Sequence, residues 1–141
     1  MATTKNSTKC KVSDILFRAL LIIYIGAIAY LCFANMNNLP QLQKEFFGIP
    51  TDKLVHFCMF FPFPIIAFYA FDRRLKSRAE LLSSLIKLCA WGCIFAGVTE
   101  MVQATLPYRS QDVKDFAADC IAIGISSLIL LIINLIKFKK K

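Results

Sequence analysis

Histidine and metal-binding motifs are scarce in this chain. Among its 141 residues there is one histidine, His56, and neither a CxxC nor an HExxH motif occurs. The six cysteines fall mostly inside apolar runs, where a free cysteine usually serves as a small buried packing residue. Zinc ligands and disulfides are therefore disfavoured, and we predict no metal site and no cofactor.

Charge is also sparse, because only 18% of the residues are charged while 57% are hydrophobic and the mean hydropathy is +0.60. A water-soluble domain of this size could hardly cover so much apolar surface. The net charge of +8 would suggest nucleic acid only if the basic residues shared an exposed face with aromatic residues. They form short clusters between apolar runs instead, so we predict contact with membrane lipid and none with nucleic acid.

Four apolar runs of 18–22 residues dominate the sequence, and each is close to the ~20 residues with which an α-helix crosses a bilayer. They lack the alternation of strands, so we predict an all-α membrane protein, a four-transmembrane-helix bundle. The first run is expected to be an uncleaved span rather than a signal peptide. The predicted parts are a cytoplasmic N-terminal tail (1–14), a transmembrane domain (15–136) with spans at 15–34, 54–71, 85–106 and 116–135, and a basic cytoplasmic tail (137–141).

Lys and Arg residues predict the orientation of these spans. Thirteen of them lie on the side that holds both termini and the 72–84 loop, and four lie on the other side. Because cytoplasmic flanks are enriched in Lys and Arg, both termini should be cytoplasmic. The opposite, outer side carries six of the nine acidic residues and the single histidine.

Ionisable side chains from three separate segments should lie at one depth near the outer surface. Asp52 and His56 are four residues apart and share a helix face. Glu100 lies about one turn inside the end of the third run, which Pro107 terminates. Three aspartates, spaced i, i+3 and i+7, share a face leading into the fourth run. The full polar set, which includes the neutral amide of Gln103, is Asp52, His56, Glu100, Gln103, Arg109, Asp112, Asp115 and Asp119.

An ionised carboxylate at this depth costs on the order of 2–3 kcal/mol unless it is paired or hydrated. The expected partners are His56 and Arg109, which lies in the connection between the third and fourth runs. Such a cluster can be a ligand or reaction site, or a polar staple between helices. Two further expectations concern packing: Pro62 and Pro64 should kink the second span, and the small residues of the fourth span should be close-packing positions. These small residues are Gly124, Ser126 and Ser127.

The segments DKLVHFCMFF (52–61) and TEMVQATLPYRSQDVKDFAAD (99–119) resemble the VanZ-like family of bacterial membrane proteins. The family pattern is Asp-Lys-x-x-His, then Glu-x-x-Gln, an Arg, and an Asp four residues before an Asn. Its matches here are Asp52, Lys53, His56, Glu100, Gln103, Arg109 and Asp115. Asp119 replaces the family Asn, and Ala122 stands where a Gly is usual. The resemblance covers residues 52–127 and implies a small multi-pass protein of the bacterial inner membrane.

The function we predict is that of a cell-envelope accessory that binds a lipophilic or lipid-linked ligand at the outer leaflet and affects glycopeptide (teicoplanin) tolerance, as the resemblance implies. Alternatives are a membrane enzyme acting on a phosphate or ester of an envelope lipid, and a structural adaptor. Arg109 would engage an anionic group. The catalytic candidates are Asp52, His56, Glu100 and Asp115, and the ligand-binding candidates are Arg109, Gln103, Lys53 and Asp119.

Overall fold

The computed structural model describes residues 2–35, 45–46, 48–72, 75, 77–109 and 112–139, with the side chains of 2–11, 46 and 49 outside that description. The elements in chain order are α1 (Ala2–Phe33), β1 (Glu45–Phe46), β2 (Ile49–Pro50), α2 (Thr51–Phe60), α3 (Phe63–Phe71), α4 (Arg78–Gln103) and α5 (Val113–Lys139). The two short strands form an antiparallel hairpin.

The predicted fold class is confirmed: the protein is all-α, and four of its helical segments are long and apolar enough to cross a membrane. These segments are Val12–Phe33, Thr51–Phe71, Arg78–Gln103 and Val113–Lys139. Their outward faces carry large apolar side chains such as Ile22, 72% exposed, and Trp91, 66% exposed. Such faces suit lipid rather than water.

The third span differs from its predicted bounds at both ends. It begins at Arg78 rather than residue 85, so half of the predicted 72–84 loop is helix. The cause is a capping signal that hydropathy does not detect, because the Ser77 side chain accepts a hydrogen bond from the Glu80 amide at 3.1 Å. The helix ends at Gln103, three residues earlier than expected and before Pro107.

The second span is broken into α2 and α3 by a turn at Phe61 and Pro62. Because Pro62 and Pro64 have no amide hydrogen, they cannot continue the ladder of helical hydrogen bonds, and the predicted kink is confirmed in a stronger form. The Tyr24 hydroxyl of α1 donates a hydrogen bond to the carbonyl of Met59, just before the break. This hydrogen bond joins α1 to the second span next to the break.

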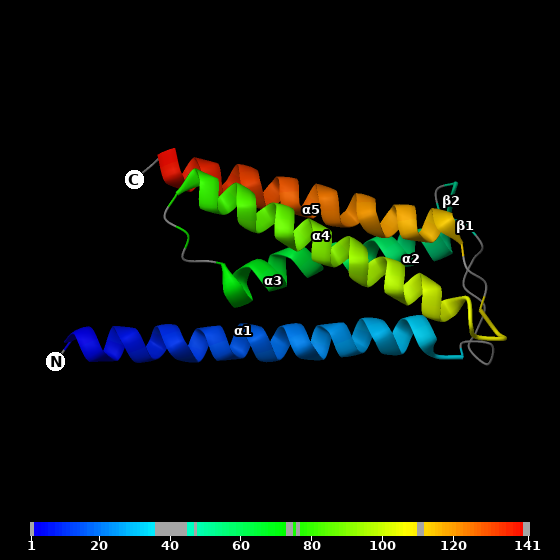
Figure 1. The fold of residues 1–141 in the computed structure, drawn as a ribbon, viewed down its shortest axis with the longest axis horizontal. Helices are drawn as coiled ribbons and strands as arrows, with labels where there is room; N and C mark the ends of the chain where they lie inside the picture. Colours follow the sequence, from blue (N-terminus) through cyan, green and yellow to red (C-terminus); the bar gives the residue numbers. More distant parts are fainter. Residues whose placement is uncertain are drawn as a thin grey trace.

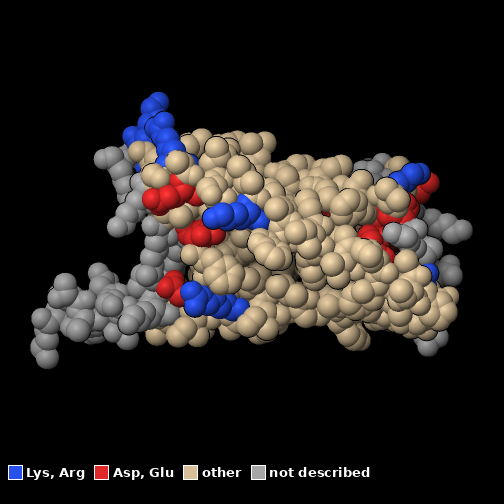
Figure 2. Space-filling view, viewed as in Figure 1, with Lys and Arg blue, Asp and Glu red and all other residues tan. Residues whose placement is uncertain are grey.

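Figure 1 shows α1 lying along α3 on one side of the molecule while α4 and α5 run together on the other. Both termini and the α3–α4 connection lie at one end, which we call the termini end. The β1–β2 hairpin and the α4–α5 connection lie at the other end, the hairpin end. The charged side chains gather near the two ends and leave a largely uncharged band between them (Figure 2).

Much of the charge that predicted the orientation lies outside the described side chains. Arg18, which is described, sits 5.5 Å from the ring centroid of Phe71, and its Nε donates to the Ala70 carbonyl at 3.4 Å. It therefore joins α1 to α3 at the termini end. The basic residues outside the description are Lys5, Lys9, Lys11, Lys44, Arg73, Arg74, Lys76, Lys140 and Lys141.

Two buried apolar clusters fill the interior. The one toward the termini end includes Phe68, Leu81 and Leu130, and the one toward the hairpin end includes Phe60 and Ile123. The second cluster forms the apolar floor beneath the polar residues described next, because His56 is one turn from Phe60 and Asp119 one turn from Ile123.

Glycine packing differs from expectation. A Cβ at Gly124 would have nothing within 4 Å, so the prediction that Gly124 is a close-packing position is wrong. The close approach occurs at Gly92 of α4, where a Cβ would lie 3.0 Å from Ile123 and 3.0 Å from Phe63. The five cysteines with described side chains, Cys32, Cys58, Cys89, Cys93 and Cys120, are all free thiols.

Candidate functional site: a buried histidine among carboxylates

Seven polar side chains from α2, α4, α5 and the residue before α5 meet at the hairpin end. We call them the His56 cluster: Asp52, Lys53, His56, Glu100, Asp112, Asp115 and Asp119. The proline-flanked start of α2 at Thr51 puts His56 in the second helical turn. Asp112 begins α5 by accepting a hydrogen bond from the Lys114 amide at 2.8 Å, the role of an N-cap residue.

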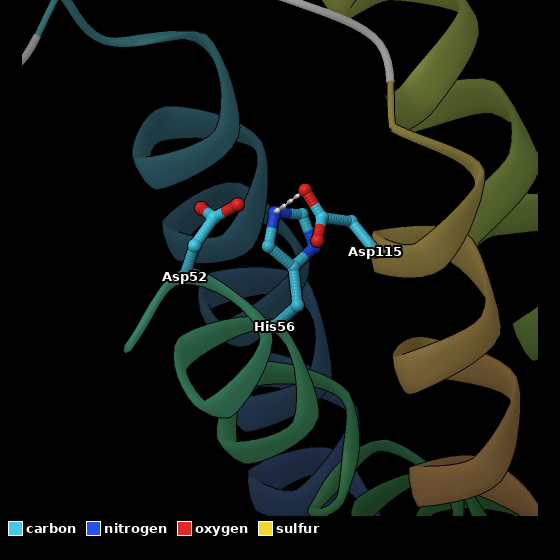
Figure 3. A group of neighbouring side chains, drawn as sticks. All are labelled: Asp52, His56 and Asp115. Atoms are coloured by element: carbon cyan, nitrogen blue, oxygen red, sulfur yellow. Dashed lines mark ion pairs between the residues drawn. The ribbon is translucent and has the colours of Figure 1, made fainter. Parts of the chain in front are cut away.

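His56 lies at the centre of the cluster and is only 4% exposed. Its Nδ1 is 3.2 Å from Oδ1 of Asp119, which has no exposed surface. Its Nε2 faces Oδ2 of Asp115 at 3.9 Å. Figure 3 shows the ring between Asp52 of its own helix and Asp115 of α5. Each ring nitrogen therefore faces a carboxylate, and only the Nδ1 contact with Asp119 is within hydrogen-bond distance among the described residues.

Lys53 supplies the primary amine of the cluster. Its Nζ donates hydrogen bonds to Oδ2 of Asp112 at 2.9 Å and to Oδ1 of Asp115 at 3.0 Å. The hydrogen bond from Lys53 lowers the pKa of the Asp112 carboxyl below its ordinary range, and the Lys114 amide adds to that effect. Asp115 thus bridges Lys53 on one oxygen and His56 on the other, and this bridge ties α2 to α5.

Glu100 has a buried carboxylate oxygen without a hydrogen-bond partner among the described residues. The residue is 3% exposed, and its Oε2 accepts a long hydrogen bond, 3.4 Å, from the Asp112 amide. Its Oε1 lies 4.0 Å from Nδ1 of His56 and has no hydrogen-bond partner among the described residues. A buried carboxylate oxygen without a partner is energetically unfavourable, so this atom points to something that binds there.

Two predicted ligand-binding residues lie instead at the end of α1. The Arg109 Nη2 donates to the carbonyls of Leu31 at 3.0 Å and Ala34 at 3.5 Å. The Gln103 Nε2 donates to the Cys32 carbonyl at 3.1 Å. A helix leaves its last carbonyls without intrahelical partners, and these donors satisfy them.

Tyr108 completes this α1 cap, because its hydroxyl donates to the Phe33 carbonyl at 2.9 Å. Sequence reasoning overlooked Tyr108, since a tyrosine in a short loop carries no signal of its own. The expected ion pair between Arg109 and a carboxylate is absent among the ion pairs of the described residues. The carbonyls of α1 occupy Nη2 in its place, while Nε of Arg109 is buried without a hydrogen-bond partner among the described residues. Lys53 takes the role expected of Arg109.

The structure therefore brings six of the eight predicted site residues together and separates Arg109 and Gln103 from them. The six are Asp52, Lys53, His56, Glu100, Asp115 and Asp119. Asp119, at the position where the VanZ-like pattern has an asparagine, is the closest carboxylate partner of His56 in the described part of the chain. An asparagine there could hydrogen-bond the ring but would bring no negative charge.

The fold and the site define a class: an all-α protein with four membrane-length helices and a buried histidine–carboxylate cluster at one end. The sequence matches no protein-family model, and it matches no solved structure. It is 27% identical over 124 residues to an uncharacterised protein of Schizosaccharomyces pombe (strain 972). That alignment covers 87% of this chain and 65% of the yeast protein, so the chain spans less than two thirds of that relative. This fungal relative is uncharacterised, so it does not test the resemblance to the VanZ-like family. That resemblance and the bacterial membrane it implies stay predictions.

Proposed function

We propose that this multi-pass membrane protein binds the polar part of a lipophilic or lipid-linked molecule at the His56 cluster. The observation that carries the proposal is Glu100 Oε1, a buried carboxylate oxygen that faces the cluster without a hydrogen-bond partner in the described structure. The cluster is rich in acceptors, so a ligand with hydroxyl or ammonium donors complements it. The ligand's apolar part would lie along the lipid-facing surface of the helices.

In the cell this activity would serve an envelope accessory in a bacterial inner membrane, with tolerance to teicoplanin as one phenotype. The proposal takes these features from the resemblance to the VanZ-like family. Binding of an anionic group by Arg109 stays a prediction, because Nη2 of that residue caps α1. Both termini would be cytoplasmic, which places the His56 cluster at the outer leaflet.

Binding is tested with the full chain in lipid nanodiscs and three probes: undecaprenyl phosphate, an undecaprenyl-linked disaccharide–pentapeptide, and teicoplanin. Native mass spectrometry should detect one probe bound per protein, with the donor-rich glycan or glycopeptide preferred to the bare phosphate. Glu100→Gln should weaken that binding by about 10- to 150-fold, since loss of a charged hydrogen bond costs about 1.5–3 kcal/mol. Glu45→Gln makes the same chemical change at an exposed position of the same end and should leave binding unchanged. Equal probe binding by Glu100→Gln and Glu45→Gln would show that the ligand does not bind at the His56 cluster.

A membrane enzyme acting on a phosphate or ester of an envelope lipid is the second candidate. The specific observation in its favour is His56 held between Asp119 and Asp115, an arrangement that suits a general base. Hydrolysis of undecaprenyl or phospholipid substrates by the purified protein, abolished in His56→Ala, would establish it. A panel of such substrates left unchanged would count against it.

A structural adaptor is the third candidate, supported by the bonds that join α2 to α5 through Lys53 and His56. It predicts that variants of the cluster lower the melting temperature without any effect on probe binding. Binding measured at a temperature where both variants are folded separates this candidate from the first.

A further inference from the structure

We infer that His56, Glu100 and Asp119 form a binding site for one divalent transition-metal cation. Each of the three offers one ligand atom, and these atoms all lie within 4.8 Å of one another. All three residues are buried, and they come from three different helices, α2, α4 and α5. The site would therefore join the three helices at a single point.

The ligand atoms are Nδ1 of His56 and one oxygen from each carboxylate. The imidazole nitrogen is 3.2 Å from Asp119 Oδ1 and 4.0 Å from Glu100 Oε1. Metal–ligand bonds of about 2.0–2.2 Å put neighbouring ligand atoms about 3–3.5 Å apart, so Asp119 is already in range and Glu100 needs a small rotation of its side chain. A bound cation would take the place of the hydrogen bond between His56 and Asp119.

The other side of the imidazole faces a carboxylate that lies just beyond hydrogen-bond distance. When Nδ1 binds the cation, Nε2 carries the proton and points at Asp115 Oδ2, 3.9 Å away. Histidines that bind metals commonly donate their second ring N–H to a carboxylate, which fixes the tautomer. Lys53 in turn holds Asp115 in place at 3.0 Å.

A second observation, independent of the clustering, is the unpartnered oxygen of Glu100. Oε1 is buried and faces His56, and the described ion pairs of Lys53 go to Asp112 and Asp115 instead. A divalent cation would satisfy this oxygen and balance the charges of Glu100 and Asp119 together, with the imidazole neutral. Buried carboxylates require such pairing.

The alternative trio of Asp52, His56 and Asp115, drawn in Figure 3, fits a cation less well. Asp52 is exposed, and Asp115 already accepts a hydrogen bond from the ammonium of Lys53. A cation there would compete with Lys53 and bring two positive charges together. Among the described residues, no Lys or Arg side chain pairs with the carboxylates of the buried trio.

The donor set narrows the choice of ion. One imidazole and two carboxylates suit Zn²⁺ or Mn²⁺, whereas Ca²⁺ takes 6–8 oxygen ligands. Three protein ligands also leave a coordination position for water or for an oxygen of a bound molecule, as in catalytic zinc sites. Phosphate or carbonyl oxygens are the groups that such a cation polarises.

The experiment uses the full chain in detergent, stripped with a chelator and dialysed against Zn²⁺ or Mn²⁺ alone. Elemental analysis should find about one equivalent of metal in the wild-type protein, bound at least about tenfold more tightly than in Glu100→Gln or Asp119→Asn. Asp52→Asn, which alters only the alternative trio, should bind like the wild type. Wild-type binding no tighter than that of Glu100→Gln would overturn the inference, as would loss of binding in Asp52→Asn alone.

Thermal unfolding keeps the test decisive if Asp119→Asn does not fold. Added metal should raise the melting temperature of the wild type and of Asp52→Asn but not that of Glu100→Gln, whose amide has nearly the shape of the carboxylate. No lipid probe is present in these measurements. Failure of the metal inference therefore leaves lipid binding open, and lipid binding measured in chelator tests the proposed function by itself.

Discussion

Asp119 shows how strongly one residue depends on its partner in this protein. Its carboxyl is fully buried, and His56 is its hydrogen-bond partner, 3.2 Å away. Removing one partner of a buried ion pair leaves an uncompensated charge, whereas removing both leaves only a cavity. The residue scale is therefore where the cluster is most sensitive to substitution.

His56→Ala should lower the free energy of unfolding by about 3–5 kcal/mol, because Asp119 then loses its partner. The double variant His56→Ala/Asp119→Ala should lose less than the sum of the two single changes, with a coupling of about 0.5–3 kcal/mol. Denaturant unfolding of the four proteins in the same detergent gives the coupling. Additive losses in the free energy of unfolding would contradict a direct contact between His56 and Asp119.

Acidification should weaken the bond between Lys53 and Asp112. Because the pKa of Asp112 is lowered in the folded protein, its contribution to stability is present above the ordinary value of 3.8 and is lost as pH falls through the folded-state value. The melting temperature of the wild type should exceed that of Asp112→Asn at about pH 6, and the difference between the two should shrink toward about pH 3. Asparagine keeps the N-cap hydrogen bond, so the variant isolates the charge. A gap that does not change with pH would contradict the pairing.

At the scale of elements, the close approach of α4 to its neighbours depends on Gly92. Gly92→Ala should lower the free energy of unfolding by about 1–3 kcal/mol, because the new methyl group would press on Phe63 and Ile123. Gly124→Ala is the matched control, since its Cβ meets nothing and alanine favours helix by up to about 1 kcal/mol. Calorimetry of both variants checks the prediction. A Gly92→Ala variant as stable as Gly124→Ala would contradict the close approach of α4 to Phe63 and Ile123.

At the scale of the whole molecule, both termini and the α3–α4 connection lie at one end, opposite the α4–α5 connection (Figure 1). Reporter fusions at the N-terminus, at the C-terminus and after Leu75 should therefore be active on one side of the membrane, and a fusion after Thr105 on the other. The excess of Lys and Arg at the termini end predicts that the first side is the cytoplasm. A terminus on the same side as Thr105 would contradict the arrangement.

The sequence by itself determined the class of the fold, because helix is the structure that satisfies the backbone of four isolated apolar runs in lipid. It also predicted that Asp52, His56, Glu100 and Asp115 belong together, since helix spacing and depth depend on short stretches of sequence. Helix ends were less predictable: hydropathy is averaged over a window, while the start of α4 is decided by the side chain of Ser77.

Only the tertiary structure decided which charge pairs with which. Arg109 and Lys53 are both cations at the hairpin end, and nothing local distinguishes them. The end of α1 lies against the α4–α5 connection, so its carbonyls take Arg109, while Lys53 on α2 faces Asp112 and Asp115. Side chains far apart in sequence compete for the same partners, and only their positions in space settle that competition. In the described part of the chain, the same positions leave Oε1 of Glu100 without a hydrogen-bond partner beside His56 and Asp119.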